Sequence, residues 1–240
     1  MNLTIDLGNT FCKIIIFEDN IIVYRHVCKS LSTRLLHQLF RDFNISNAVI
    51  SSVIPCSTTV KKALKKYRIR EFSSTTKIPI KNLYTTPKTL GKDRLANGIA
   101  AAFLFPKENV LVIDAGTCLK FDFVDAKKNY RGGSISPGLS MRFIAMHQLT
   151  GKLPLAPIND PKRLIGNSTI TALQVGVFNG MSEEINGIIA RYKKEFGELH
   201  VILTGGDASR FVGQLNLSIF AASDLVNIGL NEIIKYKLLK

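Results

Sequence analysis

One local pattern occurs twice in this chain, and it restricts the folds that the chain can adopt. In each copy an apolar run leads into a short turn of the form Asp-x-Gly, and a second apolar run follows the turn. The first turn is Asp6-Leu7-Gly8-Asn9-Thr10, and the second is Asp114-Ala115-Gly116-Thr117. Two β-type runs around a short turn predict a β-hairpin. We therefore expect two half-molecules that each begin with strand, turn and strand.

The composition of the first turn favours a backbone that binds anions. Gly8 is free to adopt a positive φ and Asn9 tolerates the left-handed region, so consecutive N–H groups can converge as in the nests that bind phosphate. Asp6, at the end of the first strand, is placed to reach a metal ion held by those phosphates. The alternative is an ordinary hairpin with an Asx turn. A third turn, Thr204-Gly205-Gly206, follows an apolar strand, and three such turns in this order favour two lobes that close on a nucleotide.

The overall composition is that of a globular protein. With 240 residues, of which 46% are hydrophobic and 21% charged, the chain can form one large domain or two small ones. No apolar run approaches the roughly 20 residues of a membrane span, and no basic leader precedes Asp6, so we expect a cytoplasmic protein without membrane contact. The four cysteines and four histidines lack the spacing of a zinc or redox site.

The net charge of +14 raises the question of nucleic-acid binding. The basic residues are spread along the chain, with one dense run at residues 61–70. On a helix, the four lysines of this run fall on one face, and Ala63 and Leu64 face inward. We expect a solvated helix face rather than a nucleic-acid site, because no aromatic interleaving accompanies the lysines.

Hydrophobic periodicity predicts alternating strands and helices. In the first half, strands are expected at residues 3–5, 14–17, 21–27, 47–53 and 69–72, helices at 31–43, from 57 onward and at 92–103, and an irregular connection at 73–91. The second half is expected to contain a hairpin at 109–125, strands at 130–135, 199–203 and 218–221, helices at 138–149 and 166–196, a short helix around 211–212, and a closing helix at 225–234 interrupted by Gly229. This pattern indicates an α/β fold with lobes at residues 1–105 and 106–240.

Further motifs accompany the three turns. They are Leu90-Gly91-Lys92-Asp93-Arg94, Gly132-Gly133-Ser134-Ile135-Ser136-Pro137-Gly138, residues 150–154 and residues 166–169. In this order and spacing, the motifs resemble those of the acetate and sugar kinase, Hsp70 and actin superfamily, and within it those of type III pantothenate kinases. The resemblance covers nearly the whole chain. It implies two RNase H-like (actin-like ATPase) lobes, each a mixed central sheet with flanking helices, and an ATP cleft between the lobes.

The resemblance also implies roles for the turn residues. The first turn would wrap the ATP phosphates, with Mg²⁺ near Asp6, while the second turn would contact the phosphates again and the Thr-Gly-Gly turn would support the adenosine. The residues assigned to ATP in this way are Asp6, Leu7, Gly8, Asn9, Thr10, Phe11, Cys12, Lys13, Thr117, Gly205 and Gly206.

A proton acceptor for the attacking hydroxyl is also implied. Asp93 resembles the proton acceptor of the family, and Arg94 is suited to a substrate carboxylate because its planar fork pairs with it in bidentate fashion. The residues assigned to pantothenate by the resemblance are Tyr84, Gly91, Lys92, Asp93, Arg94 and Thr169. From the residues alone, an Asp at this position can equally be a helix cap.

Asp114 resembles the family's ligand for a monovalent cation, K⁺ or NH₄⁺. The alternatives are that Asp114 serves the magnesium ion or caps its own turn. Two neighbours depart from the family pattern: Lys120 stands where many relatives have a small polar residue and can either touch phosphate or point outward, and Cys118 has no assigned role.

The leading interpretation is an ATP-dependent kinase that converts pantothenate to 4′-phosphopantothenate, the first step of coenzyme A biosynthesis. The resemblance implies a homodimer with the long helix at 166–196 as its seam. Another small-molecule kinase of the same superfamily remains an alternative, because fold does not fix substrate. A kinase-like accessory transcription activator that binds nucleic acid is a second alternative, which the intact Asp6, Asp93 and Asp114 disfavour.

Overall fold

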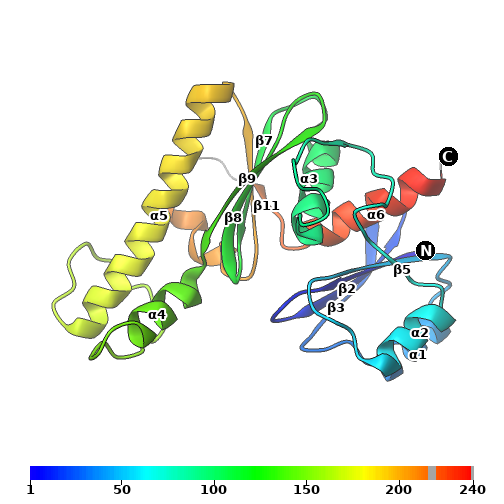
Figure 1. The fold of residues 1–240 in the computed structure, drawn as a ribbon, viewed down its shortest axis with the longest axis horizontal. Helices are drawn as coiled ribbons and strands as arrows, with labels where there is room; N and C mark the ends of the chain where they lie inside the picture. The colour runs from blue at the N-terminus through cyan, green and yellow to red at the C-terminus, as the bar shows by residue number, and fades with distance from the viewer. Residues whose placement is uncertain (216–219, 239–240) are drawn as a thin grey trace. The chain divides into compact units, whose positions relative to one another are not determined.

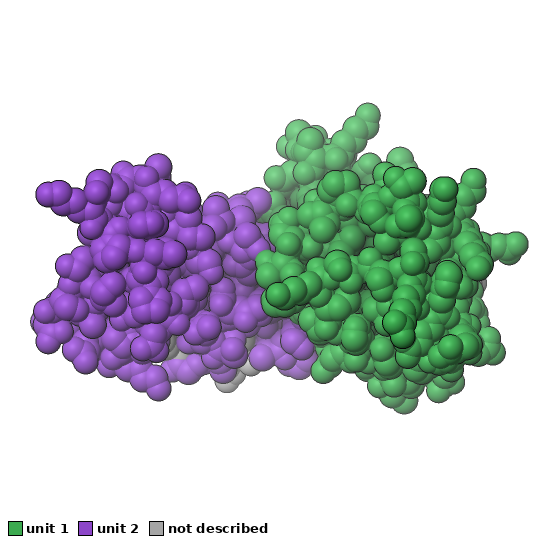
Figure 2. Space-filling model, turned by 90° about the horizontal axis from the view of Figure 1, so that it is seen from below, with its two compact units in different colours: residues 1–107, 124–132, 224–240 green, residues 108–123, 133–223 purple. Residues whose placement is uncertain are grey.

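The computed structural model describes residues 1–215 and 220–238, which pack as two compact units (Figures 1 and 2). The first unit comprises Met1–Lys107, Val124–Gly132 and the C-terminal segment from Asp224. The second unit comprises Glu108–Phe123 and Gly133–Ser223. The chain first crosses between units next to the expected lobe boundary, and the first unit also takes in the tip of a later hairpin and the last helix.

The first sheet has five strands in the order β3-β2-β1-β4-β5. Its strands are β1 (Asn2–Leu7), β2 (Cys12–Glu18), β3 (Ile21–Cys28), β4 (Asn47–Ser52) and β5 (Arg70–Glu71). Strands β1, β2 and β3 form an antiparallel meander, whereas β4 runs parallel to both β1 and β5. Residues 14–17 of β2 are all buried. A continuous apolar run of this kind is typical of a strand that is covered on both faces.

Two helices cover one face of the first sheet. Helix α1 (Thr33–Asp42) begins after Ser32 and helix α2 (Thr58–Lys66) begins after Ser57, and each serine side chain accepts a hydrogen bond from an N–H of the first turn. Their buried residues share one cluster with the apolar residues of β1 and β2. The four lysines of α2 are exposed, whereas Val60 and Ala63 of the same helix are buried.

The chain returns to the first unit through helix α6 (Leu225–Leu238), which packs beside helix α3 (Lys92–Leu104). The Asn227 amide of α6 donates to Thr4 Oγ1 of β1 at 3.0 Å. The expectation that Gly229 interrupts this helix is wrong, because α6 runs through it. A Cβ at Gly229 would lie 2.0 Å from the Ala96 carbonyl oxygen, so the glycine permits the close approach of α3.

The second sheet has six strands in the order β11-β10-β7-β8-β9-β6. They are β6 (Lys81–Asn82), β7 (Val110–Ala115), β8 (Cys118–Val124), β9 (Asn129–Pro137), β10 (His200–Thr204) and β11 (Phe220–Ala221). Without β6, the order of the first sheet is repeated strand for strand. The predicted α/β fold with two mixed sheets is therefore confirmed. Strand β6 was expected to be irregular chain, since two paired residues carry no detectable period.

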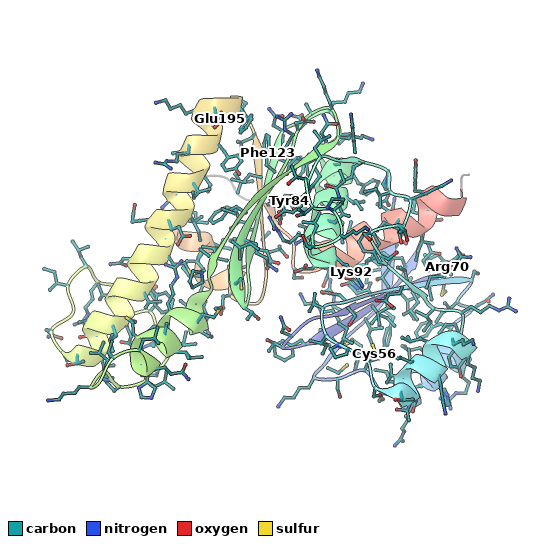
Figure 3. All side chains as sticks on the ribbon, viewed as in Figure 1. Cys56, Arg70, Tyr84, Lys92, Phe123 and Glu195 are labelled. Atoms are coloured by element: carbon teal, nitrogen blue, oxygen red, sulfur yellow. The ribbon has the colours of Figure 1, made fainter. Side chains whose placement is uncertain are left out.

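Helices α4 (Leu139–Gln148) and α5 (Thr169–Phe196) belong to the second unit. The apolar stripe of α5 lies in the buried core of that unit, where Phe123 packs against Tyr192 and Phe196 at ring-centroid distances of 5.3 and 4.4 Å. Phe123 is labelled in Figure 3. The short helix expected around 211–212 is instead two 3₁₀ turns, Ala208–Arg210 and Val212–Gln214. Of the strand expected at 218–221, residues 218 and 219 lie outside the described residues. None of the described helices combines the length and apolar character that a membrane crossing needs.

Candidate functional site

The first Asp-x-Gly turn joins β1 to β2. Asp6 is half-buried and lies directly opposite Lys13 in the antiparallel register. The loop is closed by a hydrogen bond from the Gly8 N–H to the Phe11 carbonyl at 3.0 Å. Neither Gly8 nor Asn9 has a positive φ, so the expected left-handed turn is wrong. A nest alternates right- and left-handed residues, and this loop is instead a plain hairpin connection.

The residues assigned to ATP in this hairpin divide by exposure. Asn9, Thr10 and Phe11 are exposed at the tip of the loop, whereas the side chains of Leu7 and Cys12 are buried in the core. Burial, followed by the neighbouring Cys28 thiol, raises the pKa of the Cys12 thiol. Cys12 therefore stays a neutral core residue, and a ligand at this loop would meet its backbone only.

The predicted substrate loop ends where α3 begins, so the expected helix start near Asp93 is confirmed. Gly91 is the N-cap residue, and a Cβ there would lie 2.6 Å from Asp93 Oδ1, which places the carboxylate over the helix N-terminus. Arg94 is only 4% exposed, and its guanidinium lies 5.8 Å from the centre of the Tyr84 ring. Tyr84 thus lies beside α3, whose first residue is Lys92 (both are labelled in Figure 3). The Lys92 ammonium is 2.8 Å from Glu71 Oε1.

The second Asp-x-Gly turn joins β7 to β8 in the second unit. Asp114 is the fifth residue of the six-residue β7, as Asp6 is of the six-residue β1. Its Oδ2 atom is 2.7 Å from the Lys120 ammonium, and the two side chains are only 12% and 16% exposed. The sequence left two directions open for Lys120, toward phosphate or outward. In the structure the ammonium instead points at Asp114. Thr117, at the tip of the turn, is exposed.

The Thr-Gly-Gly turn packs on this second turn. Gly205 has φ +100°, and a Cβ there would lie 2.3 Å from the Ala115 carbonyl oxygen and 2.6 Å from Asp114 Oδ1. The Asp207 N–H donates to the same Ala115 carbonyl at 2.9 Å. Gly206 has no atom within 4 Å of the corresponding position. Gly205, predicted for the adenosine, thus lies against Asp114 and Ala115 at the start of the turn that carries Thr117, predicted for the second phosphate contact.

Gly138 is a residue of this site that received no role from the sequence. A Cβ at Gly138 would lie 2.3 Å from the carbonyl oxygens of both Gly116 and Thr117. The start of α4 is thereby held against the second turn. The signal that could have indicated it is the Ser-Pro-Gly sequence immediately before the helix.

Thr169 is the first residue of α5 and is exposed. Ser168 caps this helix and Thr171 completes the capping box, so the helix begins three residues after the start predicted at 166. An open depression of about 650 Å³ lies here, lined by Met146, Leu153 and residues of 166–176. Thr169 and the turn residues of β7 and β10 belong to the second unit, whereas Asp6, Tyr84, Asp93 and Arg94 belong to the first.

Within residues 1–215 and 220–238, no three His, Cys, Asp or Glu side chains are grouped so that they could hold a metal ion. A site of single carboxylates such as Asp6 suits Mg²⁺, which usually takes one or two carboxylates and fills its remaining positions with water and substrate phosphates.

Comparison with known proteins places this geometry in a family. A family model described as type III pantothenate kinase matches residues 2–191. The type III pantothenate kinase of Phocaeicola vulgatus is 43% identical over 238 residues, which cover 98% of this chain and 98% of that protein. The one from Bacteroides fragilis is 42% identical with the same coverage.

Solved structures agree at the level of the fold. A conserved putative Baf family transcriptional activator from Campylobacter jejuni has a TM-score of 0.64 at 20% identity and covers 99% of this chain and 100% of that one. A putative 2-dehydro-3-deoxygalactonokinase from Sinorhizobium meliloti has a TM-score of 0.58 at 14% identity, with 99% of each chain covered. The chain belongs to the type III pantothenate kinase family.

Proposed function

We propose that the chain is an ATP-dependent kinase that phosphorylates the primary hydroxyl of pantothenate to give 4′-phosphopantothenate, the first step of coenzyme A biosynthesis. The observation that carries this proposal is the repeated aspartate. Asp6 and Asp114 occupy the same position of the first strand in two sheets of the same strand order. In each unit the same strand thus supplies a carboxylate and leads into a glycine turn, which suits the binding of a metal-bound phosphate.

The chemistry of phosphoryl transfer fits residues of this kind, because positioning and charge stabilisation provide most of the catalysis. We assign the ATP phosphates to the loop after Asp6 and to Thr117, and the adenosine to Gly205 and Gly206. When it is bound, Mg²⁺ would neutralise charge on the phosphates, with Asp6 as its nearest protein carboxylate.

Pantothenate carries a carboxylate at one end and the accepting hydroxyl at the other. We assign the carboxylate to Arg94, whose guanidinium is buried beside Tyr84 and is therefore held in a fixed orientation. We assign the removal of the hydroxyl proton to Asp93, with Gly91 and Lys92 forming the adjacent backbone. Thr169, at the N-terminus of a long helix, is assigned a further contact with the substrate.

A free K⁺ or NH₄⁺ ion at Asp114, which the resemblance implies, does not fit beside the ion pair of this structure. Asp114 Oδ2 is 2.7 Å from the Lys120 ammonium, and the space near Oδ1 is bordered by Gly116 and Gly205. We therefore assign no step to a free monovalent cation.

We also propose a homodimer, and a cytoplasmic location because ATP is the phosphate donor. Support for the dimer comes from strongly exposed apolar side chains of the second unit: Leu149, Leu164 and Ile165 are 83%, 81% and 77% exposed. We assign these exposed apolar side chains to the proposed interface. Activity and molecular mass would be followed together through a dilution series; full activity in a pure monomer would remove this proposal.

The function is tested by incubating the protein with ATP, Mg²⁺ and a panel of alcohols that includes pantothenate. We expect phosphate transfer to pantothenate, detected as 4′-phosphopantothenate by mass spectrometry. Transfer to a different alcohol would replace the substrate assignment, and absence of transfer to every alcohol would refute the kinase proposal.

A role in nucleic-acid binding is the second candidate, since the net charge is +14 and one relative by fold is titled a putative transcriptional activator. Neutralisation of DNA phosphates predicts that affinity falls steeply with salt. A salt-titrated DNA-binding assay tests this candidate, and affinity that is too weak to measure at low salt excludes it.

A further inference from the structure

The ion pair between Lys120 and Asp114 is placed at a point where the proposed function needs positive charge. Asp114 is the penultimate residue of strand β7, just before the turn assigned to ATP phosphate, and Gly205 of the adenosine turn packs against its carboxylate. A shielded carboxylate at this place would repel the phosphates of a nucleotide unless a cation compensated it. Compensation at Asp114 is therefore a requirement of nucleotide binding by this turn.

Lys120 meets this requirement from within the chain. Its ammonium is 2.7 Å from Asp114 Oδ2, within hydrogen-bonding distance, and both side chains are largely shielded from water at 16% and 12% exposed. A lysine side chain ends in an ammonium group with three N–H donors. It therefore has the same charge as a bound K⁺ or NH₄⁺ ion and donates N–H hydrogen bonds as NH₄⁺ does.

The position of Lys120 is fixed by its strand rather than by a flexible loop. Residues alternate along β8: Leu119, Phe121 and Phe123 belong to the buried cluster shared with α5. Lys120 consequently points to the other face of the sheet. Asp114 points to that face as well, because Ile113 and Ala115 on either side of it belong to the buried cluster. The pair is thus set by the pleat of two adjacent strands.

We propose that Lys120 is a tethered substitute for a monovalent cation, so that this enzyme binds ATP and transfers phosphate without K⁺ or NH₄⁺. The proposal rests on the proposed kinase function for its consequence in catalysis. Lys120 acts here as a positioning residue: it neutralises Asp114 and keeps the second turn receptive to phosphate. A free cation at Asp114 would have to share one carboxylate with the lysine and would be repelled by it.

Variants at Lys120 test this proposal, because removal of the ammonium should make ATP affinity depend on a monovalent cation. Lys120→Met keeps much of the side-chain volume and removes the charge, Lys120→Ala also opens space for an ion, and Lys120→Arg retains the charge. Lys194→Met is the matched control, because it removes the charge of an exposed lysine in the same unit. ATP affinity is measured by calorimetry in choline, K⁺ and NH₄⁺ chloride at one ionic strength, about 0.1 M, so that screening is equal.

For the wild-type protein, Lys120→Arg and Lys194→Met, we expect the ATP affinity of each protein to be the same in all three salts. Lys120→Ala should lose about tenfold or more of its ATP affinity in choline and regain most of it in K⁺ or NH₄⁺. A purely structural ion pair would give a loss that no cation restores. If the wild-type protein itself needs K⁺ for ATP binding, or if Lys120→Ala loses affinity equally in every salt, the proposal is wrong.

A second measurement does not depend on ATP or on the folding of the variants. Tl⁺ is a probe for K⁺ sites, and its binding to the wild-type protein is followed by ²⁰⁵Tl NMR. We expect no Tl⁺ uptake that K⁺ displaces; displaceable uptake by the wild-type protein overturns the proposal. Failure of the kinase function is distinguishable. Cation-independent transfer to an alcohol other than pantothenate would leave Lys120 in its role and change the substrate assignment. K⁺-dependent transfer to pantothenate would keep the proposed kinase function and refute the role of Lys120.

Discussion

Replacing Gly205 by alanine tests how the Thr-Gly-Gly turn is held on the second Asp-x-Gly turn. Gly205 has φ +100°, where a residue with a Cβ is strained by about 1–2 kcal/mol. The new Cβ would also lie 2.3 Å from the Ala115 carbonyl oxygen and 2.6 Å from Asp114 Oδ1. Overpacking of this kind costs about 1–3 kcal/mol more. We therefore expect Gly205→Ala to lower the free energy of unfolding by about 3 kcal/mol, or roughly 6–12 °C in Tm for a protein of this size.

Gly206→Ala is the matched control, because it lies in the same turn, has no positive φ and has no atom within 4 Å of its Cβ position. Its free energy of unfolding should stay within about 0.5 kcal/mol of wild type. Both variants are measured by urea denaturation followed by circular dichroism, and ATP affinity is measured by calorimetry. Equal stability of the two variants would refute the argument that the turn docks through Gly205.

Three further predictions follow from other contacts. Asp93→Asn should lower turnover by about 10²–10⁴ while ATP affinity, measured by calorimetry, stays near wild type; unchanged turnover would remove Asp93 as the proton acceptor. Gly229→Ala should lower the free energy of unfolding by about 1–3 kcal/mol, because its Cβ would meet the Ala96 carbonyl. Gly187→Ala, on an exposed part of α5 with nothing within 4 Å, should raise the free energy of unfolding by about 0.5–1 kcal/mol. If urea denaturation shows Gly229→Ala to be the more stable of the two variants, the packing argument is wrong. Burial acts to raise the pKa of Asp125, but hydrogen bonds from the Asn129 side chain and nearby backbone N–H groups outweigh it and lower that pKa. Asp125→Asn should therefore be less stable than wild type at pH 7. The stability difference should shrink as pH falls from about 3.9 through the lowered pKa. A difference that is constant with pH would show that the charge of Asp125 contributes nothing.

Much of the secondary structure was predictable because local chemistry decides it. The apolar runs of β2 and β7 are continuous at residues 14–17 and 110–113. The serines before α1 and α2 accept hydrogen bonds from the first turns, as caps do. The start of α3 at Lys92 was also predicted, and α5 begins at Thr169, three residues after the start predicted at 166. Each of these features depends on residues only a few positions apart, so a linear sequence contains the information.

One expectation failed within a turn, and another failed where distant segments meet. Gly8 is free to adopt a positive φ, yet the hairpin closes without it, since the hydrogen bond from its N–H to the Phe11 carbonyl forms with ordinary backbone angles. Gly229 was read as a helix breaker, but its absent side chain instead makes room for the backbone of Ala96. For Gly229 the residue type was informative, and its neighbour Ala96, far away in the chain, determined its use.

The sequence by itself determined the repeated hairpins, the order of the elements and the residue types offered to a nucleotide, because periodicity and turn chemistry are local. Only the tertiary structure decided that Gly205 rests on Ala115, that Arg94 lies beside Tyr84 and that Lys120 faces Asp114. These pairs are set by strand pleat, helix crossing and sheet order. These contacts depend on how strands and helices lie in space, so hydrophobic periodicity and turn chemistry along the chain cannot predict them.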